Sequence, residues 1–267
     1  MRADAQGAAY PSSVKKRLDV LLHERGLAAS RAQAQALIMA GRVPPYAKPG
    51  TQVDDSIELH VASGPRFVSR GGEKLVNAID GLRVTLAGAS CLDAGASTGG
   101  FTDALLQHGA ARVIAVDVGY GQLHPRLRAD PRVTVLERTN VRTLVVLPYA
   151  PDFITCDLSF ISVRTALPGV LRLCAPGWRG LVLVKPQFEA GRKQVGKGGV
   201  VRDAEVQRRT LHEVAVAALG WGAVVAGVVD SGLPGPKGNR EFFLLLEQRA
   251  RPERPDELDD WIADAVG

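Results

Sequence analysis

The stretch SCLDAGASTGGFTDALLQH, residues 90–108, decides the fold. A short apolar run is followed by the glycine-rich loop 95–100, and from Phe101 apolar residues recur at helical spacing. Such a loop lets a ligand approach the backbone and the N-terminus of the following helix. The loop reads G-x-x-x-G-G, not the dinucleotide pattern G-x-G-x-x-G, and Asp93 before it would repel a pyrophosphate. We therefore expect a ligand with positive charge and no phosphate.

Outward from this stretch, short apolar runs alternate with amphipathic segments. Strands that alternate with helices predict βαβ units and an α/β fold, in which helices cover both faces of a mostly parallel sheet. The last two runs are separated only by the loop 231–239, so we expect them to form an antiparallel hairpin at one side. The seven expected strands lie within residues 90–95, 111–119, 132–138, 152–160, 180–186, 223–232 and 240–248.

Polar residues are expected where the first three strands end. A single Asp or Asn at a strand end is commonly a turn residue. However, α/β sheets bind ligands at the carboxyl ends of their strands, so three such residues together favour a binding site. Asp93 suits a cationic group, Asp117 suits ribose hydroxyls, and Asn140 suits the edge of adenine. S-adenosylmethionine has these groups and no phosphate, and it is the expected cofactor.

Four further charged residues are candidates to meet near that cofactor. Asp157 and Lys185 end the fourth and fifth expected strands, Lys74 precedes the first strand, and Glu241 begins the last. Each of them taken alone is best explained as an ordinary salt bridge or a solvated side chain. A lysine that closes a hydrophobic strand is nevertheless unusual, and it points to a role at the same edge of the sheet.

A small basic module precedes this region. Apolar residues at helical spacing predict two short helices, the first ended by Gly26 and the second capped by Ser30 with Gln33 and closed by Gly41. Arginines and lysines around the helix ends suit contacts with phosphate, although an ordinary solvated face is the alternative. We expect a disordered leader over residues 1–14 and a linker over residues 63–68.

The module resembles the S4-like RNA-binding domain over residues 15–62, a small α+β fold. The resemblance is carried by RLDVLL, SRAQAQALIMAGRV and KPGTQVDDSIELHV. It implies that Arg17, Arg31 and Arg42 face RNA. After the position of Arg42, the family continues with a short strand and an Asn-Gly turn, whereas residues 44–50 of this chain read PPYAKPG. Because proline cannot donate to a strand ladder, we expect this strand to be distorted.

Both modules together resemble the hemolysin A-type ribosomal RNA methyltransferases, a branch of the FtsJ-like 2′-O-methyltransferases. The motifs that carry this resemblance are SRGGEKL, LDAGASTGGFTDALLQHGA, CDLSFIS, VKPQFEAG, GGVVRD and GNREFF. It implies a Rossmann-like, seven-stranded class I methyltransferase domain over residues 69–250, dependent on S-adenosylmethionine, before an acidic C-terminal tail over residues 251–267. It also implies methyl transfer to a ribose 2′-hydroxyl in 16S or 23S rRNA, with cytidine as the expected nucleoside.

The resemblance assigns roles residue by residue. It implies a catalytic tetrad of Lys74, Asp157, Lys185 and Glu241, in which Lys185 accepts the hydroxyl proton or positions the hydroxyl. Asp157 and Glu241 would orient the two lysines. The residues expected to hold the cofactor are Asp93, Gly95, Ser97, Thr98, Gly99, Gly100, Phe101, Asp117, Asn140 and Asp157.

The placement of charge favours a polyanionic partner more than the formal net charge of +5 does. The glycine-rich segment from Lys185 to Arg202 holds five basic residues against Glu189 alone, and such a loop can follow a phosphate backbone. A second basic stretch, residues 126–142, fits either RNA contact or a solvated surface. We expect rRNA or ribosomal subunits as partners, with contacts from Arg17, Arg31, Arg42, Arg70, Arg192, Lys193 and Lys197.

Other classes of function fit the sequence less well. Three cysteines at Cys91, Cys156 and Cys174, without paired spacing, indicate neither a disulfide scaffold nor a metal site, and they fit the cytoplasm. The longest uncharged apolar stretch, residues 214–229, contains three glycines and is too short for a membrane span. A membrane-active haemolysin, a nicotinamide oxidoreductase and a non-catalytic RNA-binding or ribosome-assembly protein are the alternatives. The sequence leaves the oligomeric state open.

Overall fold

The computed structural model describes residues 14–267, and these residues form two compact units. The first unit ends at Arg66, and the second runs from Phe67 to Gly267. The leader predicted for residues 1–14 lies outside the described residues except for Val14.

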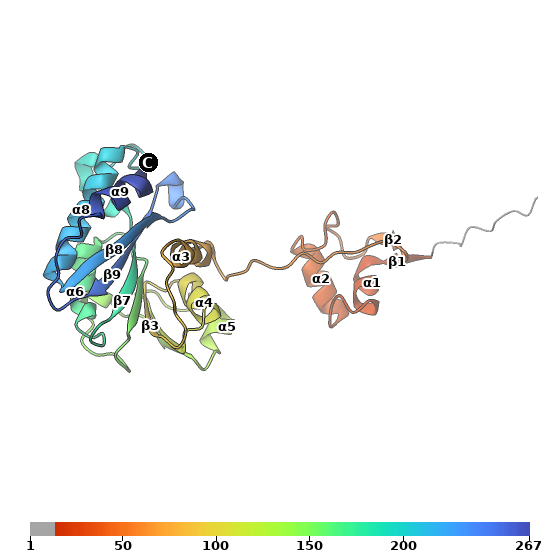
Figure 1. Cartoon of the computed structure of the whole chain (residues 1–267). Helices are drawn as coiled ribbons and strands as arrows, with labels where there is room; N and C mark the ends of the chain where they lie inside the picture. The colour runs from red at the N-terminus through yellow and green to blue at the C-terminus, as the bar shows by residue number, and fades with distance from the viewer. Residues whose placement is uncertain (1–13) are drawn as a thin grey trace, which may run out of the picture. The chain divides into compact units, whose positions relative to one another are not determined.

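The second unit is built on one seven-stranded sheet (Figure 1). Five neighbouring strands of the sheet are parallel. The seventh strand along the chain lies antiparallel between the strands that come fifth and sixth along the chain. The order is β5-β4-β3-β6-β7-β9-β8. The predicted α/β fold and the predicted hairpin are confirmed. The strands are β3 (Ser90–Ala94), β4 (Arg112–Val116), β5 (Val133–Leu136), β6 (Phe153–Cys156), β7 (Arg179–Val184), β8 (Ala223–Asp230) and β9 (Phe242–Gln248).

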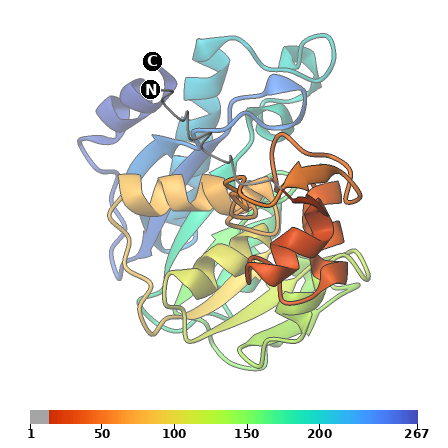
Figure 2. The same cartoon turned by 90° about the vertical axis from the view of Figure 1, so that its right-hand side faces the viewer.

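Helices cover both faces of this sheet. One face carries α3 (Arg70–Gly81), α4 (Gly100–Gln107) and α5 (Pro125–Arg128), and the other carries α6 (Val163–Leu171), α8 (Ala204–Gly220) and α9 (Leu258–Val266) (Figure 1). Figure 2 shows α3 lying across the strands with α4 beside it.

The side chains of each strand alternate between the two faces. On β3, Cys91 packs into the core under α3 and α4, whereas Leu92 and Ala94 pack into the core under α6 and α8. Because both faces are covered, the central strands are mostly apolar, and Asp93 of β3 and Thr155 of β6 are buried polar exceptions. Only their carboxyl ends are left to present polar groups to a ligand.

The C-terminal tail differs from a merely acidic surface segment. Its helix α9 buries Leu258 and Ile262, each 1% exposed, in the same core as α8. The acidic residues Asp259 and Asp260 lie on the opposite side of the helix and are exposed. Residues 251–267 therefore contribute a stabilising element of the second unit.

The first unit contains the two predicted helices, α1 (Leu18–Glu24) and α2 (Arg31–Met39). Ser30 caps α2 as expected, because its Oγ accepts a hydrogen bond of 3.1 Å from the Gln33 amide. Gly26 and Gly41 both have a φ of +69°, which suits glycine at a helix end.

The strands of the first unit differ from the expectation. Residues 15–17, for which no strand was predicted, form β1 (Lys15–Arg17) and pair antiparallel with β2 (Gln52–Asp54). No strand follows Arg42 at the prolines; residues 44–50 form turns and irregular backbone. A pairing between such distant segments leaves no signal in local periodicity, which explains why β1 was not predicted.

In the part of the chain that the structure describes, no helix is long and apolar enough to cross a membrane. The stretch 214–229 ends α8 at Gly220, turns at Trp221 and Gly222, and continues as β8.

Candidate active site

The glycine-rich loop after β3 shapes the carboxyl edge of the sheet. A Cβ atom on Gly95, whose φ is +90°, would lie 2.3 Å from the carbonyl oxygen of Asp157. A Cβ on Gly100 would lie 2.2 Å from the Ser69 hydroxyl. Contacts below 3 Å are not tolerated, so the loop can pack between β6 and α3 only with glycine at these positions. It forms the boundary of two adjoining cavities, which share Gly95, Ser97 and Asp157.

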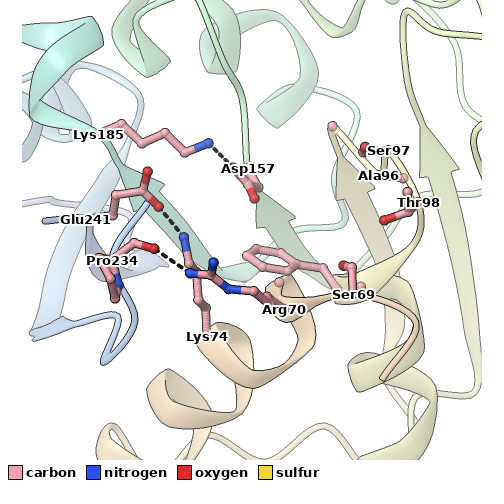
Figure 3. Close-up of a pocket in the computed structure, with 14 residues that line it drawn as sticks. Ser69, Arg70, Lys74, Ala96, Ser97, Thr98, Asp157, Lys185, Pro234 and Glu241 are labelled. Atoms are coloured by element: carbon pink, nitrogen blue, oxygen red, sulfur yellow. Dashed lines mark hydrogen bonds and ion pairs between the residues drawn. The ribbon is translucent and has the colours of Figure 1, made fainter. Parts of the chain in front are cut away.

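The first cavity, of about 640 Å³, brings together all four residues of the predicted tetrad (Figure 3). Lys74 projects from α3, and its Nζ lies 2.5 Å from Oε2 of Glu241, which directly precedes β9. Lys74 is 7% exposed and Glu241 is 1% exposed. These two residues are far apart in sequence and form a buried ion pair.

The second ion pair of the cavity joins Lys185 to Asp157 (Figure 3). These residues directly follow the neighbouring parallel strands β7 and β6. Lys185 is 7% exposed, and its Nζ also donates a hydrogen bond of 3.2 Å to the Ser159 hydroxyl. Two lysines, each neutralised by a carboxylate, thus face one cavity beside the glycine-rich loop.

The second cavity, of about 480 Å³, contains the residues expected to hold a nucleoside. The two carboxylate oxygens of Asp117 accept hydrogen bonds from the backbone amides of Ser97 and Gly119, at 2.8 and 2.7 Å. These bonds fix the carboxylate, and each oxygen retains a lone pair for a ligand. Apolar side chains such as Val118, Leu158 and Ile161 form its walls.

Asn140 lines this cavity but does not end a strand. The strand β5 ends at Leu136, and Asn140 instead caps the short 3₁₀ helix η1 (Val141–Thr143) by accepting a hydrogen bond of 3.0 Å from the Arg142 amide. The side-chain oxygen of Asn140 is thus engaged in the cap, and its NH₂ group can donate a hydrogen bond to a ligand.

Asp93 differs most from its expected role as a cofactor ligand. It is fully buried and lies outside both cavities. Its carboxylate accepts hydrogen bonds from the hydroxyls of Thr102 and Thr155, at 2.7 and 3.1 Å, and so ties β3 to α4 and β6. Burial raises the pKa of Asp93 to about 7, against the effect of these hydrogen bonds. The position of Asp93 therefore favours a role in supporting the glycine-rich loop rather than direct contact with a cofactor.

The other loop residues divide between lining and support. Ser97, Thr98, Gly100 and Phe101 line the first cavity, and Phe101 also packs on Phe243 of β9. Gly99 lines neither cavity; it precedes α4 with a φ of +96°, a conformation that favours glycine.

In the first unit, two of the arginines predicted to contact RNA bind one buried carboxylate. Asp19 accepts from Nε and Nη2 of Arg17 at 3.0 Å each, and from Nε of Arg31 at 3.1 Å. The Arg17 guanidinium is the largest cause of a pKa of Asp19 far below its usual range. Arg42 donates instead to the carbonyl of Ala62.

The basic residues of the second unit fall into three groups. Arg192, Lys193 and Lys197 are exposed on the segment that includes the 3₁₀ helix η2 (Arg192–Gln194). Arg70 lines the first cavity, and its guanidinium donates to the carbonyl of Pro234 at 2.7 Å (Figure 3). In the other basic stretch, ion pairs link Arg126 to Asp103, Arg128 to Glu137 and Arg132 to Asp130.

Comparison with known proteins identifies the family. The model of the FtsJ-like methyltransferase family matches residues 67–248, and that of the S4 domain matches residues 16–43. The chain belongs to the FtsJ-like methyltransferase family. The resemblance predicted from the motifs is thus confirmed.

Similar proteins extend this result over both units. The 16S/23S rRNA (cytidine-2′-O)-methyltransferase TlyA of Mycobacterium tuberculosis is 48% identical, over 94% of this chain and 97% of its own. The putative rRNA methyltransferase YqxC of Bacillus subtilis is 44% identical, over 93% and 92%. A solved structure of a putative hemolysin from Streptococcus thermophilus superimposes with a TM-score of 0.72 at 39% identity, covering 95% of this chain and 96% of that one.

Several residues that line the candidate site were not predicted from the sequence. A third cavity, of about 350 Å³, adjoins Lys185 and Glu241 and is lined by Phe160 and Phe188, whose ring centroids lie 5.3 Å apart. Phe160 is 92% exposed and has a φ of +66°. An aromatic residue three positions after Asp157 in CDLSF was the available signal. The remaining missed contacts come from Ser69, Ser159, Gln187, Pro234 and Asn239.

Proposed function

We propose that the protein transfers the methyl group of S-adenosylmethionine to a ribose 2′-hydroxyl of rRNA, with cytidine as the nucleoside. The observation that carries the proposal is the meeting of the Lys74–Glu241 and Lys185–Asp157 ion pairs in one cavity beside the glycine-rich loop. The names of the similar proteins TlyA and YqxC support the substrate class. A ribosomal substrate implies action in the cytoplasm.

The second cavity fits the nucleoside part of S-adenosylmethionine. A fixed carboxylate at Asp117 suits the two ribose hydroxyls, and the apolar walls with Asn140 suit adenine. The two cavities adjoin at Gly95, Ser97 and Asp157, so the methionine part would extend from the second cavity toward Asp157 and Lys185 in the first. When bound, the cofactor supplies an electrophilic methyl group on a sulfonium.

The first cavity supplies what the ribose hydroxyl needs. A 2′-hydroxyl is a poor acid, so transfer requires a group that holds it in line and removes its proton. Lys185, held by Asp157 and Ser159, is the group we assign to one or both of these tasks. Lys74 and Glu241 line the same cavity and keep its charge balanced.

RNA recognition would use parts of both units. The exposed residues Arg192, Lys193 and Lys197 suit phosphates near the site, and the arginines of the S4 domain suit structured RNA elsewhere. The third cavity offers the paired rings of Phe160 and Phe188 next to Lys185, and aromatic rings stack with unpaired bases.

One assay tests the proposal. The protein is incubated with ribosomal subunits and labelled S-adenosylmethionine, and 2′-O-methylated positions are mapped. We expect label in rRNA, no label with Lys185→Ala, and unchanged cofactor binding by this variant in calorimetry. The matched control Arg132→Ala, which alters a surface ion pair, should keep full activity. RNA binding without methyl transfer would instead support a ribosome-assembly protein, and an active Lys185→Ala variant would refute the assignment.

A further inference from the structure

Two neighbouring segments carry the Lys185–Asp157 ion pair of the proposed site. The segment after β6 holds Asp157 and Ser159, and the segment after β7 begins with Lys185. At the cavity, Lys185 joins the two segments through both of these partners. The alignment at Lys185 therefore also depends on what holds the two segments together farther along the chain.

A second connection, made by Glu189, lies on the short helix α7 (Pro186–Glu189), one turn beyond Lys185. Its side chain is 1% exposed. Oε1 accepts a hydrogen bond of 2.8 Å from the Val163 amide, and Oε2 accepts one of 2.5 Å from the Ser162 hydroxyl. Both partners begin α6, directly after the segment that holds Asp157.

Arg164 closes the connection. Its Nε donates to Oε2 of Glu189 at 3.2 Å, and its Nη2 donates to the Glu189 carbonyl at 3.0 Å. The third guanidinium nitrogen of Arg164, Nη1, lies 2.9 Å from Oε2 of Glu213 on α8. The Glu189 carboxylate is thus satisfied by three donors, and burying a charge without such partners would be costly.

The segment between the two connections contributes to all three cavities. Residues 157–161 supply Ser159 to Lys185, and Leu158 and Ile161 to the wall of the second cavity. Glu189 holds the end of this segment and lines none of the three cavities. Its carboxylate is therefore placed to set the alignment without taking part in chemistry.

We propose that Glu189 is a positioning residue for methyl transfer, which holds residues 157–162 against the segment after β7 so that Asp157 and Ser159 align Lys185. The inference rests on the proposed role of Lys185. Because a displacement of about 1 Å can cost about a hundredfold in rate, the loss of this connection should act mainly on kcat.

The experiment compares Glu189→Ala and Glu189→Gln with the matched control Glu213→Ala in the full chain. The control removes an ion pair from the same arginine but leaves Ser162 and Val163 bonded. We expect kcat to fall about a hundredfold in Glu189→Ala, less in Glu189→Gln because its amide oxygen still accepts from Val163, and less than about twofold in the control. KM for ribosomal subunits should stay unchanged.

Two further measurements separate positioning from loss of structure. The urea midpoint of Glu189→Gln should stay close to that of the control, while the midpoint of its pH–rate profile shifts because Lys185 has lost its alignment. A Glu189→Gln variant with the kcat and pH profile of Glu213→Ala would overturn the inference, even if Glu189→Ala does not fold. If Lys185→Ala is inactive and Glu189→Gln resembles the control, only this inference fails; an active Lys185→Ala variant refutes the proposed function itself.

Discussion

Replacing Lys74 by methionine tests the buried ion pair of the site. The substitution keeps an unbranched side chain of similar length but removes the charge that faces Glu241. Glu241 is 1% exposed, and Gly235 packs so closely on it that a Cβ there would lie 2.0 Å from Oε1. Among the residues that the structure describes, the Gln187 amide, 3.4 Å from Oε1, is the remaining hydrogen-bond donor to the carboxylate. Lys74→Met therefore leaves a carboxylate buried with one weak partner.

The expected loss of stability follows from that burial. Removing one partner of a buried ion pair costs about 3–5 kcal/mol, because the other charge stays buried without compensation. In a unit of this size, a change of about 1 kcal/mol moves the melting temperature by about 2–4 °C, so we expect Tm to fall by about 6–20 °C. The double variant Lys74→Met/Glu241→Gln, which buries no charge, should recover much of this loss.

The assay is thermal and urea unfolding of the wild type, both single variants and the double variant. From these we obtain the coupling energy between the two positions. The double variant should remain inactive in methyl transfer although its stability is restored, because both members of the pair have lost their charge. Equal melting temperatures for Lys74→Met and the wild type, or a coupling energy near zero, would refute the reasoning.

Two further predictions concern the edge of the sheet. Because the pKa of Asp93 is raised to about 7 from an ordinary value near 3.8, the stability associated with its protonated form is complete below about pH 3.8 and is lost as the pH rises to about 7, at about 1.4 kcal/mol per pH unit. Asp93→Asn, which cannot ionise, should therefore gain stability relative to the wild type between pH 5 and pH 8 in paired unfolding experiments; a pH-independent difference would contradict this. Gly95→Ala should weaken binding of S-adenosylmethionine in calorimetry at least tenfold, because its Cβ would lie 2.3 Å from the Asp157 carbonyl at a φ of +90°; wild-type affinity would show that the loop does not shape the cofactor site.

Features that depend on neighbouring residues were predicted from the sequence, whereas features that depend on contacts between distant segments were not. The seven strands of the second unit and the cap at Ser30 were predicted correctly, because hydrophobic periodicity and capping depend on neighbours in the chain. The strand β1 was missed, because Lys15–Arg17 pairs with Gln52–Asp54 across the whole first unit. Asn140 was assigned to a strand end, although β5 stops at Leu136.

The sequence by itself determined the α/β alternation, the glycine-rich loop, the family and the four charged residues of the candidate site. Only the tertiary structure decided which lysine faces which carboxylate: Lys74 with Glu241, and Lys185 with Asp157. The insertion of β9 between β7 and β8 brings Glu241 to this edge, and no local pattern specifies that insertion. The same holds for Asp93, whose pattern indicated a ligand contact. Its burial among Thr102 and Thr155 depends on how α4 and β6 pack around it, a property of the folded chain and not of the segment.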